Sequence, residues 1–328
     1  MNNKKRNKFI LVSFILLLTN LIYGCKNQTD EIKKIEINNG AIAIEDNKNY
    51  TIYNLDNGKY EKVETDYIIT EYDSESKNYI FNNNGEFKIQ YLGEERNIDD
   101  LNKIISPKLS PGGNYLSYFV KDIYLNLKIK DLKVDKFVNI DSKVAISGQL
   151  IDWYNEDTLV YYGIDNEKNN GIFLYNISNN EEKLIYQLDA GYIQFLKVLD
   201  NGIVFLQEKE GKQKILKFID ENGELVQNIQ DIDDISDVEY SKDGIFMIGK
   251  LKNNNYSLYE YNEGKIKRLV YDFPKIINLE KGLSKDSDGN ILFIGGDEPN
   301  KEKVYIYEDG FVSELSNNQG NYNFIHYK

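Results

Sequence analysis

Short apolar runs recur along the chain about every 40 residues, and each is too short for a helix. Aliphatic, β-branched and aromatic residues occupy consecutive positions in them, which is typical of a strand covered on both faces. The seven runs are 41-AIAIE-45, 78-NYIFN-82, 115-YLSYFV-120, 158-TLVYYG-163, 202-GIVFLQ-207, 244-GIFMIG-249 and 290-NILFIG-295. The pattern predicts a buried strand in each of seven similar units.

A tight polar turn precedes most of these runs, as in Ser110-Pro111-Gly112-Gly113 and Lys242-Asp243-Gly244. Gly and Asn in such turns tolerate the positive φ that a hairpin requires. The turn joins the apolar run to an earlier strand, such as 149-QLIDWY-154. Trp153 lies near the end of that strand, and we expect it to pack between neighbouring units rather than to stack on a ligand.

A second strand with cleaner alternation follows each run, for example 171-GIFLYNI-177, and a shorter, more polar strand follows that, for example 182-EKLIY-186. Four strands per unit, with polarity rising along the unit, predict the blade of a β-propeller. The expected units are 31–66, 67–103, 104–147, 148–189, 190–230, 231–273 and 274–316. We therefore predict an all-β fold, a single propeller over 34–328 with seven blades and with six or eight as alternatives. The segment 321–328 is expected to complete the N-terminal blade and close the ring.

The stretch Ser110-Pro111-Gly112-Gly113-Asn114-Tyr115-Leu116 resembles the S-P-D-G-x-x-[LIV] signature of TolB-like and WD40-like propeller repeats. Gly112 stands where those repeats usually have Asp. Ser241-Lys242-Asp243-Gly244 keeps the ends of the motif without its Pro. The resemblance implies the propeller architecture and supplies no catalytic residue, because the motif is a structural turn.

The N-terminal residues have the layout of an export signal. Lys4, Lys5, Arg6 and Lys8 form a basic head, and Phe9–Tyr23 is a mostly apolar run. This run is shorter than the roughly 20 residues that a helix needs to cross a bilayer. A retained membrane anchor is the alternative to a cleaved signal.

The run ends in 21-LIYGC-25, which resembles the lipobox of bacterial lipoproteins. The resemblance implies cleavage between Gly24 and Cys25, a diacylglyceryl thioether on Cys25 and usually a further N-acyl chain such as palmitate. Two or more acyl chains anchor a protein stably to a membrane. We expect a signal peptide over 1–24, a lipidated tether over 25–33, and an extracytoplasmic body attached to the cell membrane.

The charge balance limits the possible partners. There are 53 Asp and Glu against 40 Lys and Arg, a net charge of −13. Residues 1–24 carry four positive and no negative charges, so their removal leaves −17. Nucleic acid binding needs a concentrated basic surface, so we expect no nucleic acid partner. We also expect a monomeric protein.

Few residues are suited to catalysis or metal binding. His326 is the single His, on the expected closing strand, and Cys25 is the single Cys, so zinc or copper sites built from His and Cys are excluded. No G-x-S-x-G elbow of a hydrolase occurs. The segment Asp286-Ser287-Asp288-Gly289-Asn290 alternates carboxylates as a calcium loop does, but it aligns with the repeated turn, and we interpret it as one. The acidic run 231–237 is interpreted as a solvated connection between blades. We predict no catalytic residue, no cofactor and no metal site.

The function expected from these features is a non-enzymatic binding or scaffold module for a protein, peptide or glycan partner at the membrane. The longer hairpin loops 163–170, 207–213 and 295–302 are expected at one edge of the ring, where loops on a rigid scaffold bind partners. The alternative is a glycoside hydrolase or lyase that uses carboxylates or Tyr in the central funnel.

Overall fold

The computed structural model describes residues 35–46, 49–65, 67–83, 85–98, 103–200, 202–298, 301–316 and 318–328. The chain divides into two units, Met1–Ile35 and Glu36–Lys328, and the architecture below is that of the second. The predicted signal peptide and Cys25 lie outside the described residues. Within the described ranges, no helix is long and apolar enough to cross a membrane.

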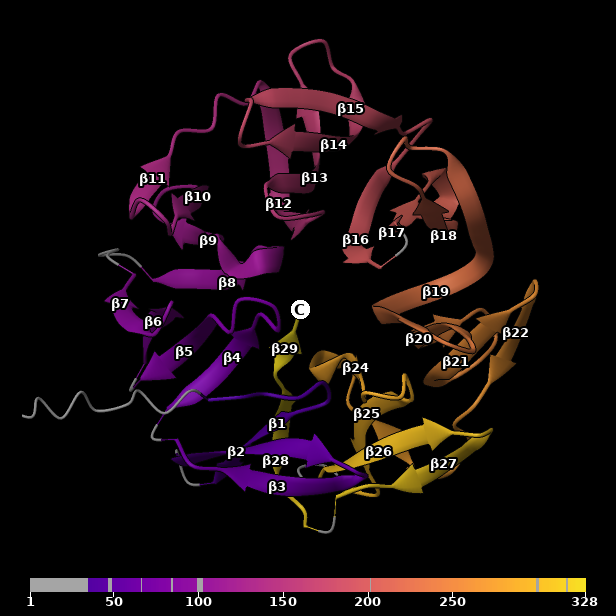
Figure 1. Cartoon of the computed structure of the whole chain (residues 1–328). Helices are drawn as coiled ribbons and strands as arrows, with labels where there is room; N and C mark the ends of the chain where they lie inside the picture. Colours follow the sequence, from indigo (N-terminus) through magenta and orange to yellow (C-terminus); the bar gives the residue numbers. More distant parts are fainter. Residues whose placement is uncertain are drawn as a thin grey trace, which may run out of the picture. The chain divides into compact units, whose positions relative to one another are not determined.

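Antiparallel strands dominate the second unit, which confirms the predicted all-β fold. The described residues contain no α-helix and three single 3-10 turns, η1 (Pro111–Gly113), η2 (Glu210–Lys212) and η3 (Leu279–Lys281). The described strands form six hydrogen-bonded sheets that stand around a common centre (Figure 1).

Three sheets hold four strands each. In order from the centre outwards they are β28 (Asn321–Phe324), β1 (Ile42–Asp46), β2 (Asn49–Asp56) and β3 (Lys59–Val63); β8 (Ile104–Leu109), β9 (Tyr115–Lys121), β10 (Leu125–Asp131) and β11 (Lys136–Val138); and β12 (Val144–Trp153), β13 (Thr158–Asp165), β14 (Asn170–Asn176) and β15 (Glu181–Gln187).

Two sheets hold five strands each. One has β29 (His326–Tyr327), β4 (Ile68–Tyr72), β5 (Tyr79–Asn83), β6 (Glu86–Tyr91) and β7 (Glu94–Asn97). In the other, β23 (Ile276–Ile277) and β24 (Leu283–Lys285) both pair with β25 (Ile291–Gly296), and β26 (Lys303–Glu308) and β27 (Phe311–Glu314) follow.

The sixth sheet has seven strands, because one strand serves two expected units. Its order is β16 (Tyr192–Leu199), β17 (Gly202–Glu208), β18 (Lys214–Ile219), β19 (Leu225–Ser241), β20 (Gly244–Leu251), β21 (Tyr256–Asn262) and β22 (Lys265–Arg268). The 17-residue β19 is the outer partner of β18 and the inner partner of β20. The expected units 190–230 and 231–273 therefore join in one sheet, and the number of blades stays a prediction.

The acidic run 231–237 does connect two expected units, as predicted, but it is part of the continuous strand β19 and not a solvated connection. Asp231 has a φ of 58°, and the pairing register shifts beyond it, so the strand bends without ending. Ile232 and Ile235 point into the core, at 3% and 7% exposure. The aspartates between and after them pair with neighbouring side chains instead of only with water, as in Asp233–Lys250.

The consecutive apolar positions of the inner strands are explained by packing on both faces of each sheet. In β13, Leu159 and Tyr161 pack in a buried cluster with Phe119 of β9. The alternate residues of the same strand, Val160 and Tyr162, pack in a second cluster with Phe205 of β17. Each face of the sheet thus covers a different neighbour, and no alternation of polar residues is needed.

Trp153 packs between sheets as predicted. It is 2% exposed, its indole N–H donates to Ser117 Oγ at 3.0 Å, and its ring stacks on Tyr115. Both partners belong to the neighbouring sheet of β8–β11, so this contact fixes two sheets together.

The C-terminal segment contributes to two sheets. β28 pairs antiparallel with β1, from Ile42↔Phe324 to Glu45↔Asn321. Tyr322 of β28 is 1% exposed and packs with Ile42 of the first sheet and Val304 of the last one. After Ile325 the chain turns, and β29 pairs in parallel with β4, so the C-terminal end lies near the centre of the ring (Figure 1).

The antiparallel order of the strands defines two ends of the molecule. The turns between the first and second strands of the units lie at one end, which we call the turn end; examples are Pro111–Gly113 and Ser241–Gly244. The segment Asn38–Gly40, which precedes β1, lies at the same end. The hairpins between the second and third strands lie at the other, the hairpin end; examples are 165–169, 209–213 and 252–255.

Candidate functional site

Carboxylates on the inner strands connect neighbouring sheets around the centre. Each accepts the backbone N–H of a residue on the next inner strand: Glu71 from Leu109 at 2.8 Å, Asp152 from Val198 at 3.0 Å and Asp237 from Leu283 at 2.8 Å. Such charge-assisted hydrogen bonds are among the stronger ones in proteins. The carboxylates therefore have a structural role between the sheets.

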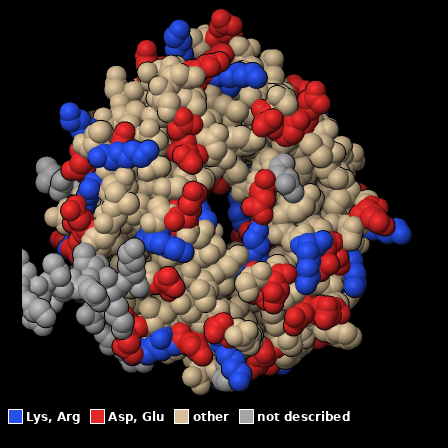
Figure 2. Space-filling view, in the orientation of Figure 1, with Lys and Arg blue, Asp and Glu red and all other residues tan. Residues whose placement is uncertain are grey.

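Lysines on the intervening strands complete the set. Their ion pairs are Lys108–Asp152 at 3.0 Å, Lys197–Asp237 at 2.9 Å, Lys197–Glu239 at 3.3 Å and Lys285–Glu239 at 3.4 Å. We call these carboxylates and lysines the inner charge belt. Figure 2 shows a narrow opening at the centre of this face, with acidic and basic atoms at its rim.

Neighbouring charges favour the ionised forms of Asp152 and Lys197. Burial alone would raise the pKa of Asp152, but the ammonium groups of Lys108 and Lys328 hold that pKa well below its usual range. Burial alone would lower the pKa of Lys197, but Asp237 and Glu239 raise it above the ordinary lysine value. Each charge thus compensates another one close by.

His326 lies beside the belt, through the pairing of His326 with Glu71 between β29 and β4. Its side chain is exposed, and within the described part of the chain it has no hydrogen-bond partner. Although part of its surface is accessible, desolvation of the imidazole by the surrounding protein and the charges of Lys108 and Lys197 lower its pKa, and the carboxylates of Glu71 and Asp237 oppose this only in part. The neutral form of the imidazole is therefore favoured more than in an ordinary histidine.

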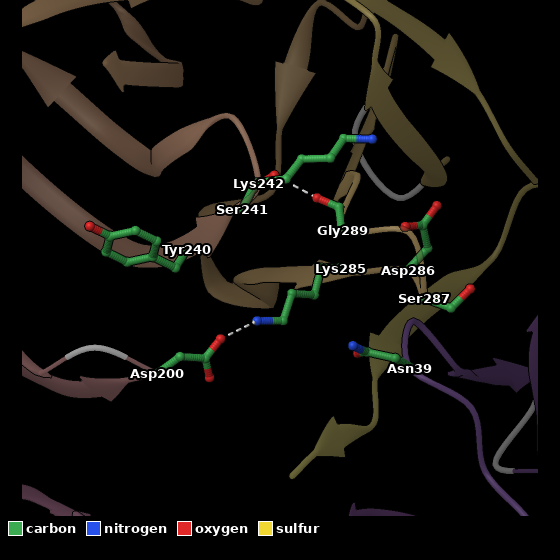
Figure 3. Close-up of a pocket in the computed structure, with 9 residues that line it drawn as sticks. All are labelled: Asn39, Asp200, Tyr240, Ser241, Lys242, Lys285, Asp286, Ser287 and Gly289. Atoms are coloured by element: carbon green, nitrogen blue, oxygen red, sulfur yellow. Dashed lines mark hydrogen bonds and ion pairs between the residues drawn. The ribbon is translucent and has the colours of Figure 1, made fainter. Parts of the chain in front are cut away.

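A hollow of about 300 Å³ opens at the turn end (Figure 3). Its lining residues are Asn39, Asp200, Tyr240, Ser241, Lys242, Lys285, Asp286, Ser287 and Gly289. They come from the turns before β1, β17, β20 and β25 and from the strand ends beside them. Turns that the sequence suggested only as repeated structural elements thus meet in one place.

The frame of the hollow is held by its own hydrogen bonds. Asp286 Oδ1 accepts the N–H groups of Asp288 at 2.9 Å and of Asn290 at 2.8 Å, which confirms that 286–290 is a turn. Ser241 donates to the carbonyl of Gly289 at 2.5 Å. Where side chains are described, no group of three or more His, Cys, Asp or Glu is placed to hold a metal ion.

Lys285 connects the hollow to the inner charge belt. Its ammonium lies 3.0 Å from Asp200 Oδ2, on one side of the hollow, and 3.4 Å from Glu239 Oε1 of the belt. These carboxylates raise the pKa of Lys285 against the effect of burial. Two ion pairs therefore hold the Lys285 side chain in place beside the hollow.

Four lining side chains have free polar groups. Over the described ranges, Asn39, Tyr240, Lys242 and Ser287 make no side-chain hydrogen bond or ion pair. These groups differ from the belt residues, which are engaged with their neighbours. The hollow therefore combines a fixed frame with groups available to a ligand.

The lining residues could not be identified as a site from the sequence, because the sequence shows only that they form turns. Once a propeller is assumed, the turns before the apolar runs must lie at the same end, and this signal could have found the hollow. The loops 163–170 and 207–213, and the described residues of 295–302, lie at the hairpin end, away from the hollow.

No known protein family matches the sequence, and no curated protein matches it. Solved structures do match. An oligogalacturonate lyase in complex with manganese has 14% identity and a TM-score of 0.56 over 79% of this chain and 82% of that one. Dipeptidyl peptidase 4 from Porphyromonas gingivalis has 14% identity and a TM-score of 0.55 over 86% of this chain, which spans about half (53%) of that one. TolB from Acinetobacter baumannii has 13% identity and a TM-score of 0.46 over 85% of this chain and 79% of that one. The likenesses to the lyase and the peptidase, together with the sheets, show the β-propeller fold alone.

Proposed function

We propose that this chain is a lipid-anchored binding module of a bacterial cell surface and that it binds its partner at the turn end. The observation that carries the proposal is the hollow, where turns of separate sheets bring free polar groups onto a fixed frame. Binding sites are commonly formed by loops on a rigid scaffold.

The anchoring part rests on the sequence. The basic head, the apolar run and 21-LIYGC-25 support export, cleavage before Cys25 and lipidation of Cys25. The mature charge of −17 keeps the propeller away from an anionic lipid surface. The turn end or the hairpin end is then free to meet molecules outside the membrane.

The non-enzymatic part rests on the engagement of the inner charge belt. A catalytic carboxylate must reach substrate and exchange a proton or form a bond. Asp152 and Asp237 instead each accept a backbone N–H and pair with a lysine. Both carboxylates are therefore used in hydrogen bonds and ion pairs that hold neighbouring sheets together.

One observation favours a second candidate, an enzyme that works in the central funnel. The pKa of His326 is lowered, and its side chain is exposed and close to Glu71, which are properties of a general base. In this case polysaccharide turnover, of the hydrolase or lyase type, would depend on His326 and on carboxylates of the belt.

Binding of the purified full chain to cell envelopes of the source bacterium tests the proposal. Lys242→Glu reverses a free charge in the hollow and should weaken binding at least tenfold. The matched control Lys252→Glu, at an exposed site of the hairpin end, should leave binding unchanged. Equal binding by wild type and Lys242→Glu would reject the turn end.

A parallel assay separates the two candidates. Wild type and His326→Ala are incubated with neutral and acidic polysaccharides, and reducing ends and unsaturated products are measured. The binding module is expected to release no product. Product formation that disappears in His326→Ala would replace the binding proposal by the enzyme.

A further inference from the structure

Residues 326–328, which we call the tail segment, run along the inner edge of β4 at the centre of the ring (Figure 1). The first two of them pair in parallel with Glu71 and Tyr72. The N–H of Lys328 then donates to the carbonyl of Tyr72 at 2.9 Å, and the backbone oxygen of Lys328 accepts the N–H of Ser74 at 2.7 Å. The tail segment is therefore bound as an added strand, which is a common way for a protein to bind an extended peptide.

The tyrosine of the tail segment extends a row of stacked rings. The ring centroids of Tyr327 and Tyr72 lie 6.1 Å apart and those of Tyr72 and Tyr79 6.2 Å apart, with 19° between the ring planes in both pairs. Tyr72 and Tyr79 are buried, at 1% and 5% exposure. Aromatic pairs on neighbouring strands stabilise a sheet beyond the area that they bury. This position of the tail segment therefore favours an aromatic side chain.

The lysine of the tail segment reaches the neighbouring sheet. The Lys328 ammonium donates to the carbonyl of Leu109, the last residue of β8, at 2.6 Å. Its charge also lowers the pKa of Asp152 on β12, so the ammonium lies within electrostatic reach of that carboxylate. Hydrogen bonds of charged groups are stronger than those of neutral groups. A long cationic side chain is therefore favoured directly after the aromatic one.

The groups that bind the tail segment are held in place by other contacts. Glu71 accepts the N–H of Leu109 at 2.8 Å, which fixes the position of the Leu109 carbonyl. The carboxylate of Asp73 accepts the N–H groups of Ser76 at 2.7 Å and of Gly112 at 2.9 Å, and so holds the turn whose N–H donates to the tail segment. A site that is already ordered costs less entropy on binding.

Few contacts hold the tail segment itself. Its ladder has two residue pairs, and its histidine is exposed and, among the described residues, makes no side-chain hydrogen bond. The preceding residue, Ile325, is 1% exposed, and its N–H donates to the carbonyl of Ala41 at 3.0 Å. Weakly held ends of a chain open locally without global unfolding. β28 and Ile325 can therefore stay in place when the tail segment leaves.

We propose that the inner edge of β4, with the Leu109 carbonyl and the Ser74 N–H, is a binding site for an extended peptide in which Lys follows an aromatic residue. The tail segment occupies this site as an internal ligand, and a partner protein with such a segment takes its place at the centre of the ring. This second site is separate from the hollow and goes beyond the proposed function.

The tail segment has an advantage over any free peptide. Its attachment to Ile325 gives it an effective concentration in the millimolar range. A partner must offset this advantage through further contacts elsewhere on the propeller. A short free peptide is therefore expected to bind only where the tail segment has been weakened.

The test uses the full chain with Tyr327→Gly and Lys328→Gly together, which remove the two side chains that anchor the tail segment. The probe is acetyl-His-Tyr-Lys-amide, and its binding is followed by saturation-transfer NMR, which detects weak ligands. The double variant should bind the probe, and the wild type should bind it at least fivefold more weakly, because its site is occupied. A thermal melt checks that the double variant keeps its fold.

Changes in the probe report which contacts are used. Replacing its tyrosine by alanine, or its lysine by norleucine, should weaken binding at least fivefold. Replacing its histidine by alanine should change affinity by less than twofold, because this side chain makes no hydrogen bond among the described residues. The scrambled probe acetyl-Tyr-His-Lys-amide has the same composition and should not bind measurably.

Three results would overturn the proposal: no binding of the probe to the folded double variant, equal binding of the probe and its scrambled form, or equal binding to the wild type and the double variant. If the double variant does not keep its fold, Lys328→Met, which removes only the ammonium, takes its place in the same comparison with the wild type, and the same results decide.

Discussion

The turn before β9 contains two glycines, Gly112 and Gly113, because its backbone has a positive φ at both positions. Their φ angles are 76° and 61°, in the left-handed region. The Gly112 N–H also donates to Asp73 Oδ2 of the preceding sheet at 2.9 Å. A Cβ on Gly113 would lie 2.4 Å from Ser76 Oγ and 2.9 Å from Asn78 Nδ2. The turn thus joins two sheets as well as two strands.

Gly113→Ala should therefore destabilise the protein by more than the ~1–2 kcal/mol that a left-handed φ costs an L-residue. Gly58→Ala is the matched control, since Gly58 has a φ of 72° and nothing within 4 Å of its added Cβ. Urea unfolding of both variants measures the difference. Equal losses in the two variants would show that the contacts with Ser76 and Asn78 adjust without cost.

His326 should make stability depend on pH below neutrality. Its folded-state pKa is lowered, first by burial and then by Lys108 and Lys197, while Glu71 and Asp237 oppose the shift. The unfolded chain therefore binds a proton first as pH falls below about 6.5, and the free energy of unfolding decreases from there to the lower, folded pKa. Asp152 acts only below about pH 4, because its folded pKa is depressed from the ordinary aspartate value.

Thermal melts of wild type and His326→Gln between pH 7 and pH 5 check this. The wild type should lose stability over this window, and the variant should lose clearly less. Parallel curves would show that His326 titrates alike in the folded and unfolded chain.

The sequence predicts the environment of some single residues and not that of others. The packing of Trp153 and the turn at Asp286 followed from local pattern, since apolar burial and turn geometry are local properties. Tyr240 and Asn39 form one site only through the closure of the ring, which brings together turns some 200 residues apart, and no local pattern records that distance.

Among the strands, Lys197 of β16 joins two inner strands at once. Its ammonium pairs with Asp237 and Glu239 and donates to the carbonyl of Val238 at 2.8 Å. Lys197→Met removes the ammonium partner of Asp237 and one of the two ammonium partners of Glu239, and we expect a loss of about 3 kcal/mol. Lys62→Met breaks the exposed pair with Glu64 and should cost about 0–1 kcal/mol in the same urea titration. A loss at Lys197 no larger than at Lys62 would contradict a structural role for the belt.

The strand β28 can be tested in a similar way. Tyr322→Ala empties the space between Ile42 and Val304, two residues of the first and last sheets, and should cost about 3–5 kcal/mol. Tyr124→Ala removes the same side chain from an exposed hairpin and should change stability by less than ~0.5 kcal/mol. Deletion of 321–328 should lower the melting temperature further, since it also frees the edge of β1. A truncated protein that melts like the intact one would show that β28 does not hold these sheets together.

The strands themselves were largely predictable, because consecutive apolar positions bounded by turns have few other solutions. The exception is β19, where the acidic run 231–237 suggested a solvated connection. Asp231, Asp233 and Asp234 alternate with buried Ile232 and Ile235 across a bend, and a bent strand lacks the regular period that sequence patterns can show.

For the whole protein, the proposed lipidation of Cys25 can be tested by mutation. Cys25→Ala removes the thiol that lipidation needs, and we expect either release to the medium or an uncleaved precursor, with loss of the acyl anchor. Membrane fractionation, detergent partitioning and the mass of the mature N-terminus measure this. Cys25→Ser, with the smallest change in shape, should behave the same way; membrane retention with normal cleavage before residue 25 would contradict lipidation.

A continuous backbone through β19 has a consequence for cooperativity. Strands β18 and β20 both form hydrogen bonds with β19. Loss of the hydrogen bonds between β18 and the first half of β19 therefore also destabilises the second half of β19, which pairs with β20. Sheets that are separated by a loop can open independently, whereas these strands share one unfolding unit. Amide protons of β18 and β20 should therefore exchange with solvent at a common free energy of opening, and a force applied to β16 is transmitted to β22 through main-chain bonds rather than through side-chain contacts.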